Sequence, residues 1–220
     1  EEIDIEIFGK NNATQWQSNV IIGTNRPTTK TEGVHTMPYS LGDGYHTYVL
    51  EWTPGYIAWF VDGTQVRRIN GGQFVTGLTS PQDLRFNLWA ANIPEWVGAW
   101  NDSILPVYQF VNYIDYKPWN AATNSFGSGG WRDDFNSFDS NRWGKANWTF
   151  GENRADFEPN NVVVKNGTLV LALTREGQTG YNGTPPVDSG SGTGSGSSSS
   201  TAPAASIKIQ ADTFKEVGGN

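Results

Sequence analysis

The chain opens with three acidic residues that alternate with isoleucines, in the stretch EEIDIEI at residues 1–7. In an extended strand residues i, i+2 and i+4 project from one face, so Glu2, Asp4 and Glu6 share a face and the isoleucines share the other. The isoleucine face suits a core, whereas unpaired buried charges would cost too much there. The alternation therefore predicts a half-buried strand that carries a row of carboxylates.

Two interpretations of this row are open. The first is a solvated edge strand, whose charges discourage pairing with another chain. The second is a catalytic site, because neighbouring like charges raise one another's pKa and so place a protonated acid beside an ionised carboxylate. No lysine interrupts the row, which favours the second interpretation.

Such a pair of carboxyl groups is what hydrolysis of a glycosidic bond needs. In the retaining mechanism one carboxylate attacks the sugar and the other protonates the leaving oxygen, with the two groups about 5–5.5 Å apart. Alternate Cα atoms in a strand are about 6.6 Å apart, and the outer two of three are about 13 Å apart. Adjacent pairs fit, and the outer pair fits if the strand curves, so spacing alone does not assign the roles.

The composition limits the kind of partner. The 220 residues have a formal net charge of −7 and contain ten Trp, eight Tyr and eleven Phe. Without a basic stripe we expect neither nucleic acid nor an anionic membrane as partner. Exposed Trp and Tyr would suit stacking on sugar rings, although core packing accounts for roughly half of these aromatic residues.

Short extended segments separated by turn residues predict an all-β fold. The turns at 53–55 and 62–63 join two hairpins, and the Asn-Gly turn in VVVKNGTLVLALT is the strongest hairpin signal. No helical periodicity is sustained over three turns, and no apolar run reaches the roughly 18 residues of a membrane-spanning helix. The expected strands lie in EIDIEIF, QWQSNVIIG, HTYVLEWTP, YIAWFVDGTQVRRI, LRFNLWAA, VYQFVNYIDYKPW and VVVKNGTLVLALT.

The domain organisation expected from the sequence has three parts. Residues 1–177 form one domain, with a connector at 119–133 that is rich in Asn, Ser and Gly. Residues 178–205 form a Gly/Ser-rich linker. Residues 206–220 contain IKIQADTF, which is similar to the first strand of some carbohydrate-binding modules, and so are expected to begin a further module.

Together with the segments on its C-terminal side, the motif E-I-D-I-E resembles glycoside hydrolase family sixteen, and within it the lichenase branch, the β-1,3-1,4-glucanases. That branch carries E-x-D-x-E on an unbulged strand. The segments IEIFGKN, YHTYVLEWTPGYIAWFVDG and LRFNLWAANIPEWVGAW stand in family order, and the resemblance covers about 160 residues. It implies a concanavalin-like β-jelly-roll of two antiparallel sheets, with the substrate on the concave one.

By position, the resemblance implies that Glu2 is the nucleophile, Glu6 the general acid/base and Asp4 the helper between them. It also implies a substrate cleft built from polar side chains and stacking indoles. The residues at the matching cleft positions are Gln17, Asn19, Glu32, Asn87, Trp89, Trp96, Trp148 and Arg154. For each Trp taken alone, core packing is an equally good explanation.

The resemblance further implies one structural Ca²⁺ on the convex side, distant from catalysis. The matching positions are Asn112, Asp134 and Gly167, which would contribute mostly backbone carbonyls. Ligation by oxygen alone agrees with a hard cation. No cofactor for catalysis is expected.

The order of the segments departs from that of ordinary lichenases. FNSFDSNRWGKANWTFGENRADF and NVVVKNGTLVLALTREG come after the catalytic strand here, as in circularly permuted members of Fibrobacter type. Roughly 50 family residues that would flank the catalytic strand are not present, so that strand is expected to be a sheet edge. We therefore expect a longer polypeptide, or an associated fragment that completes the sheet.

The leading hypothesis is a secreted, monomeric, endo-acting retaining hydrolase that cleaves β-1,4 bonds in mixed-linkage β-1,3-1,4-glucans. One alternative is another specificity of the same family, for laminarin or xyloglucan. An alternative from a different class is a lectin-like module that binds glucan without cleaving it. The intact triplet of carboxylates argues against a dedicated lectin.

Overall fold

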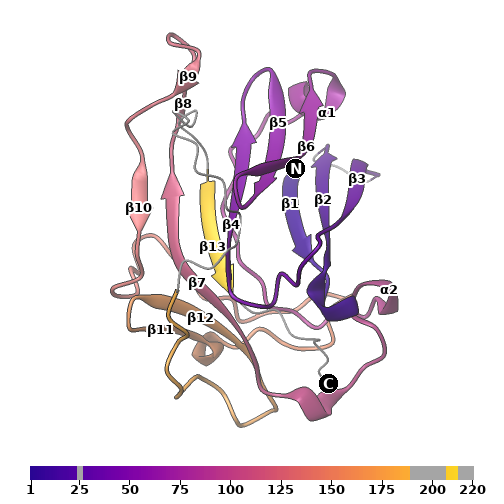
Figure 1. The fold of residues 1–220 in the computed structure, drawn as a ribbon, viewed down its shortest axis with the longest axis vertical. Helices are drawn as coiled ribbons and strands as arrows, with labels where there is room; N and C mark the ends of the chain where they lie inside the picture. Colours follow the sequence, from indigo (N-terminus) through magenta and orange to yellow (C-terminus); the bar gives the residue numbers. More distant parts are fainter. Residues whose placement is uncertain (24–26, 189–206, 213–220) are drawn as a thin grey trace.

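The computed structural model describes residues 1–23, 27–188 and 207–212, and regular structure in them is almost entirely β-strand (Figure 1). The α-helices in this part are two single turns, α1 (Gln73–Thr76) and α2 (Pro94–Val97). Short 3₁₀ turns occupy Asn11–Ala13, Asp102–Ile104 and Pro159–Asn161. The expectation that long helices are absent holds for the described residues.

The smaller sheet has the order β1–β2–β3, and its neighbouring strands are antiparallel. The strands are β1 (Glu2–Ile7), β2 (Gln15–Ile22) and β3 (Thr29–Thr36). Among the described residues β2 is the single ladder partner of β1. The strand with the three carboxylates is therefore a sheet edge, as the sequence predicts.

The larger sheet has the order β11–β12–β7–β13–β4–β5–β6, with β10 also paired to β7. In Figure 1 it curves beside the smaller sheet. Its strands are β4 (Tyr45–Trp52), β5 (Tyr56–Val61), β6 (Thr64–Asn70), β7 (Val107–Tyr116), β10 (Trp131–Asp133), β11 (Val162–Lys165), β12 (Thr168–Leu173) and β13 (Ile207–Asp212). A separate small hairpin consists of β8 (Trp119–Asn120) and β9 (Ser125–Phe126).

The hairpin turns explain how these strands are joined. Asp62 and Gly63, between β5 and β6, both have positive φ, at 49° and 79°. Asn166 and Gly167, between β11 and β12, have φ of 52° and 74°. Two consecutive positive φ values are what a two-residue type I′ turn requires, and its twist matches that of the strands. Both of these predicted hairpins are confirmed, as is the hairpin of β4 and β5 around the turn at 53–55.

The two sheets pack face to face over one apolar core. Trp16 and Val20 of β2 are fully buried against Ile57, Trp59 and Val61 of β5. The isoleucines of β1 are partly buried against the same cluster. This arrangement of two antiparallel sheets is the expected β-jelly-roll, so the predicted fold class is confirmed.

The segment LRFNLWAA differs from its prediction as a strand. Residues 84–90 belong to no ladder, and Ala91 makes an isolated bridge to Asn153. A strand is stabilised by a neighbour along its length, and among the described residues this segment is bonded to residues 152–154 only at its end. The apolar pattern predicts which side chains of the segment are buried, but pattern alone does not supply a pairing partner.

The C-terminal segments bear on the expected division into domains. The strand β13, yellow in Figure 1, lies between β7 and β4 and is paired with both. Residues 189–206 and 213–220 lie outside the described residues, so most of the expected linker and most of the expected further module are not described. The domain boundaries remain predictions.

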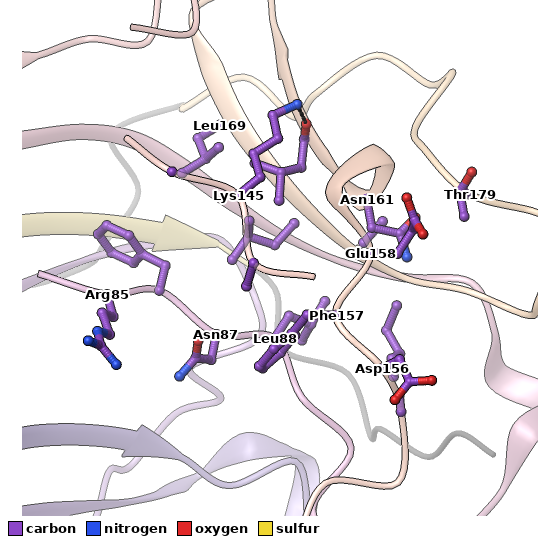
Figure 2. A pocket seen from close by; sticks show the side chains of 18 of the residues that line it. Arg85, Asn87, Leu88, Lys145, Asp156, Phe157, Glu158, Asn161, Leu169 and Thr179 are labelled. Atoms are coloured by element: carbon purple, nitrogen blue, oxygen red, sulfur yellow. Dashed lines mark hydrogen bonds between the residues drawn. The ribbon is translucent and has the colours of Figure 1, made fainter. Parts of the chain in front are cut away.

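A cavity of about 1260 Å³ opens between the segment 82–88, the loop 142–148 and the strand β12. Figure 2 shows Asn87 and Leu88 on one side of it and Glu158 and Asn161 on another. Its walls include side chains of the apolar core. The core is thus incompletely covered on the side of the molecule that carries the segment without ladder partners.

Within the described residues no helix is long and apolar enough to cross a membrane.

A buried polar network joins the start of β4 to the turn between β5 and β6. Asp62 Oδ2 accepts a hydrogen bond from Tyr39 at 3.0 Å and lies 2.8 Å from His46 Nδ1. Asp62 Oδ1 accepts from the main-chain N–H of Thr47 at 2.9 Å. Burial alone would raise the pKa of Asp62, but these hydrogen bonds lower it below the ordinary value.

We predict that Asp62→Asn lowers the free energy of unfolding by about 1–2 kcal/mol at pH 6. A lowered folded-state pKa stabilises the protein above the unfolded value of about 3.9, and this contribution is lost as the pH falls through the folded-state pKa. The difference from the parent should therefore shrink at pH 3. Urea denaturation at both pH values measures it.

The control for this prediction is Asp83→Asn, since the side chain of Asp83 is 87% exposed. We expect no measurable change in unfolding free energy for the control. Equal effects of the two substitutions at pH 6 would contradict a stabilising role for the network.

Candidate active site

The carboxylate row lies on one face of β1, as the alternation predicts. The ladder places Asp4 opposite Asn19 and Glu6 opposite Gln17 on β2. Across the next ladder, Asn19 lies opposite Glu32 on β3. Residues directly opposite each other share a face of the sheet, so the three carboxylates and these three polar residues form one continuous surface.

Asp4 is the middle carboxylate and is partly buried. Burial, and next the charge of Glu2, raise its pKa to about 7, while a hydrogen bond to Asn19 opposes the rise. Asn19 is itself only 5% exposed. The side chain opposite Asp4 therefore holds it in place from within the sheet.

Glu6 lies beside Trp89 of the segment LRFNLW. Burial raises the pKa of Glu6 to about 7, the charge of Asp4 adds to the rise, and a hydrogen bond from Trp89 opposes it. Near neutral pH a fraction of Glu6 is therefore protonated, which is the state that a general acid needs.

Three of the predicted cleft indoles are linked through aromatic contacts. The ring of Trp89 is 6.0 Å from that of Trp96 in an edge-on arrangement. Phe150 lies 5.1 Å from Trp89 and 6.3 Å from Trp148. Trp148 is 50% exposed, so at this position core packing does not account for the indole.

The remaining predicted cleft residues lie around this cluster. Asn87 is exposed and lines the large cavity, as Figure 2 shows. Arg154 is exposed and donates a hydrogen bond to the side chain of Asn92. Glu32 is exposed and makes an ion pair with Lys30 at 2.7 Å. The structure thus gathers six polar residues on one sheet and links the three indoles in a cluster that reaches Glu6 through Trp89, with Asn87 and Arg154 at the periphery.

Two supporting residues were not identified from the sequence. Trp59, fully buried in the opposite sheet, donates its indole N–H to the main-chain oxygen of Asp4 at 3.1 Å. The side chain of Asn153 accepts from the main-chain N–H of Ala90 at 3.1 Å and so anchors the segment that carries Trp89. Both contacts join residues far apart in the chain, and no local spacing signals them.

Of the predicted calcium positions, Gly167 lies in the turn between β11 and β12, Asp134 follows β10, and Asn112 lies on β7. A Cβ placed on Gly167 would be 3.7 Å from the carbonyl oxygen of Asp134 and 3.9 Å from Oδ1 of Asn136. Val111 on β7 is the ladder partner of Leu169 on β12. Asn112 is next to Val111 in sequence and Gly167 is two residues before Leu169, so Asn112 and Gly167 lie on neighbouring parts of the two strands. These neighbouring oxygens suit a hard cation. Within the described residues no cluster of three or more His, Asp or Glu that would suit a metal is present.

We predict that Glu6→Gln makes the protein more stable than the parent at pH 8, by about 1–3 kcal/mol, and leaves stability nearly unchanged at pH 4. A carboxyl with a raised folded-state pKa holds a proton that the unfolded chain releases. The parent therefore loses stability as the pH rises from the unfolded value to above 7. Denaturant unfolding across this range measures the difference.

The control is Glu32→Gln, which removes an exposed carboxylate from the same face of the sheet. We expect this control to follow the pH dependence of the parent. If Glu6→Gln also follows the parent at pH 8, burial does not raise the pKa of Glu6.

Comparison with known proteins places these features in a family. Residues 1–104 match the model of glycosyl hydrolases family 16. The chain is 44% identical over 190 residues to a beta-glucanase of Fibrobacter succinogenes, a match that covers 85% of this chain and 54% of that protein. It is 33% identical over 117 residues to a beta-glucanase of Bacillus subtilis, covering 53% of this chain and 45% of that protein.

A further relative is the Crh-like protein CRH11 of Candida albicans, 34% identical over 142 residues, or 60% of this chain and 31% of that protein. The chain thus spans about half the length of the Fibrobacter protein and less of the other two. The family match includes β1 with its three carboxylates, and the two antiparallel sheets agree with it. The chain belongs to glycosyl hydrolase family 16.

Proposed function

We propose that this chain carries the catalytic site of a secreted, endo-acting, retaining glycoside hydrolase that cleaves β-1,4 bonds in mixed-linkage β-1,3-1,4-glucans. One observation carries the proposal. Glu2, Asp4 and Glu6 share one face of β1, and the pKa of both Asp4 and Glu6 is raised to about 7. The similarity to two proteins named beta-glucanase supports a glucan as substrate.

The first step of the proposed reaction uses the two outer carboxyl groups. The carboxylate of Glu2 attacks the anomeric carbon while protonated Glu6 gives its proton to the departing glycosidic oxygen. The carbon–oxygen bond of the substrate breaks, and an ester bond to Glu2 forms. The raised pKa of Glu6 supports its role as the acid, because an ordinary Glu would be almost fully ionised at neutral pH.

The second step reverses the role of Glu6. The ionised Glu6 takes a proton from water, the water oxygen attacks the anomeric carbon, and Glu2 is released as a carboxylate. Two inversions leave the configuration at that carbon unchanged. Asp4 lies between the two groups, and its charge raises the pKa of Glu6, so the protonation of Asp4 adjusts when Glu6 binds or releases its proton.

The surroundings of the row suit a neutral polysaccharide. Sugar rings have apolar C–H faces that stack on indoles and hydroxyl groups that need fixed polar partners. Gln17 and Asn19 are nearly fully buried beside the carboxylates and supply such partners, while Trp89 and Trp96 supply the faces. We assign Glu32, Asn87, Trp148 and Arg154 to more distant parts of the same cleft.

Two alternatives predict different substrates or no turnover. Another family specificity, for laminarin or xyloglucan, would leave the same catalytic row in place, and the unbulged strand argues against laminarin. A lectin-like module would bind glucan without cleaving it. The raised pKa values of Asp4 and Glu6 argue against that alternative, because simple binding has no need of two costly buried carboxyl groups.

We also propose that a further polypeptide segment completes the sheet beside β1. Three observations on the described residues support it: β1 has one ladder partner, residues 84–90 belong to no ladder, and a cavity of about 1260 Å³ is lined by core side chains. A segment from a longer form of the chain, or an associated fragment, would pair with this edge and cover the core. We expect the completed protein to be a monomer.

The order of segments is proposed to be a circular permutation of the family order. In support, the Fibrobacter relative aligns with 85% of this chain, whereas the Bacillus relative aligns with 53%.

We also propose a structural Ca²⁺ at Asn112, Asp134 and Gly167. The main-chain oxygen of Asp134 supports it, because this oxygen lies 3.7 Å from the position of a Cβ on Gly167.

We predict that the parent releases reducing sugar from barley β-glucan and that Glu2→Gln lowers this rate by roughly 10³-fold or more. The amide keeps the size of the side chain but cannot act as a nucleophile. Parallel assays with lichenan, laminarin and xyloglucan decide the specificity. Asp43→Asn, at an exposed turn, is the control that should retain the parent rate.

Full activity of Glu2→Gln would refute the assignment of Glu2 as nucleophile. Binding of β-glucan by the parent without release of sugar would support the lectin-like alternative instead.

We predict that Ca²⁺ raises the melting temperature of the protein relative to EDTA. At a concentration of about 100 times Kd, binding to the folded state alone adds about 2.7 kcal/mol. Mg²⁺ is the control, because it requires shorter and more regular coordination than carbonyl-rich loops provide. Identical melting temperatures in Ca²⁺ and EDTA would exclude the site.

A further inference from the structure

A side chain of the opposite sheet makes a hydrogen bond to the strand β1 from behind. Trp59 of β5 is fully buried, and its indole Nε1 donates a hydrogen bond to the main-chain oxygen of Asp4 at 3.1 Å. Asp4 is the middle residue of the carboxylate row, and β1 has one ladder partner among the described residues. The indole therefore gives the edge strand a fixed contact at its centre.

Trp59 itself lies on a strand that is paired on both sides. It pairs with Leu50 on β4 and with Arg67 on β6. The guanidinium of Arg67 lies 5.2 Å from the indole ring and donates from Nη1 to the main-chain oxygen of Ser18 at 3.0 Å. Two residues paired across β5 and β6 thus reach the opposite sheet, one at β1 and the other at β2.

Asp4 is consequently fixed from two directions. On the front of the strand its carboxyl group hydrogen-bonds to Asn19, and behind the strand its carbonyl accepts from Trp59. A shift of β1 at Asp4 would change the separation of its carboxyl group from those of Glu2 and Glu6. Small displacements of catalytic groups lower rates strongly.

We propose that Trp59 is a positioning residue, whose indole N–H fixes the main chain of Asp4 and thereby the geometry of the carboxylate row. This role rests on the function proposed above. Trp59 lies behind the strand and makes no contact with a substrate on its front face. It acts on the reaction only through Asp4.

The test compares Trp59→Phe with a matched control, Trp16→Phe. Both indoles are fully buried in the same core, but Nε1 of Trp16 has no hydrogen-bond partner within the described part of the chain. Each substitution removes the same atoms, and the first alone removes a bond to the catalytic strand. A loss caused by packing would be the same in both variants.

For Trp59→Phe we expect kcat to fall roughly tenfold with little change in KM. We also expect the alkaline limb of the kcat profile to move to lower pH, because a looser strand admits water and allows Glu6 to lose its proton more easily. Trp16→Phe should keep the pH profile of the parent. Equal changes in kcat and pH profile in the two variants would overturn the proposal.

A second measurement does not depend on activity. Between pH 4 and pH 8 the free energy of unfolding should fall less in Trp59→Phe than in the parent and in Trp16→Phe, since the buried carboxyl groups become better solvated. If the parent releases no sugar, the proposed hydrolase function fails, and this measurement still decides the role of Trp59. The same slope in all three proteins would overturn it.

Discussion

The pleat of one short strand is the constraint on which the rest of the structure depends. On β1 the side chains alternate between the core and the open face, so the isoleucines that bind the strand to the sandwich also aim the carboxylates outward together. A shift of one residue in the register of β1 against β2 would bury the acids and expose the isoleucines. The register of β1 against β2 therefore determines both the packing of the isoleucines and the side on which the carboxylates lie.

This arrangement has an energetic cost that the fold must offset. Asp4 and Glu6 are partly buried beside like charges, and the raised pKa of each means that its ionised form is disfavoured in the folded state. The apolar core beneath β1, with Trp16, Ile57 and Trp59 fully buried, provides the stabilisation. The proposed catalytic role and the stability of the fold thus oppose each other at the same two residues.

Local sequence patterns are sufficient for part of this description. The alternation in β1 and the Asp62-Gly63 and Asn166-Gly167 turns predict strands, faces and hairpins, because these depend on residues close in sequence. The family resemblance predicts the residues opposite the row, and the ladder places Gln17 and Asn19 there. Their individual roles in substrate binding remain predictions.

Local sequence patterns do not predict the contacts between residues that lie far apart in the chain. LRFNLWAA has the composition of a strand, but among the described residues its pairing is limited to the isolated bridge from Ala91 to Asn153, and pairing is a property of two segments. The pairing of β13 with β4 and β7 joins residues more than ninety positions apart in the chain. The bond from Trp59 to Asp4 and the anchor from Asn153 to Ala90 likewise depend on how the sheets pack.

The central claim is that packing of β1 makes Asp4 and Glu6 titrate near neutrality. It is tested most directly by ¹³C NMR titration of the side-chain carboxyl groups, assigned through Asp4→Asn and Glu6→Gln. The account predicts that two carboxyl groups titrate near pH 7 and that each substitution removes one of them. Titration of every carboxyl group below about pH 5, as in model peptides, would contradict it.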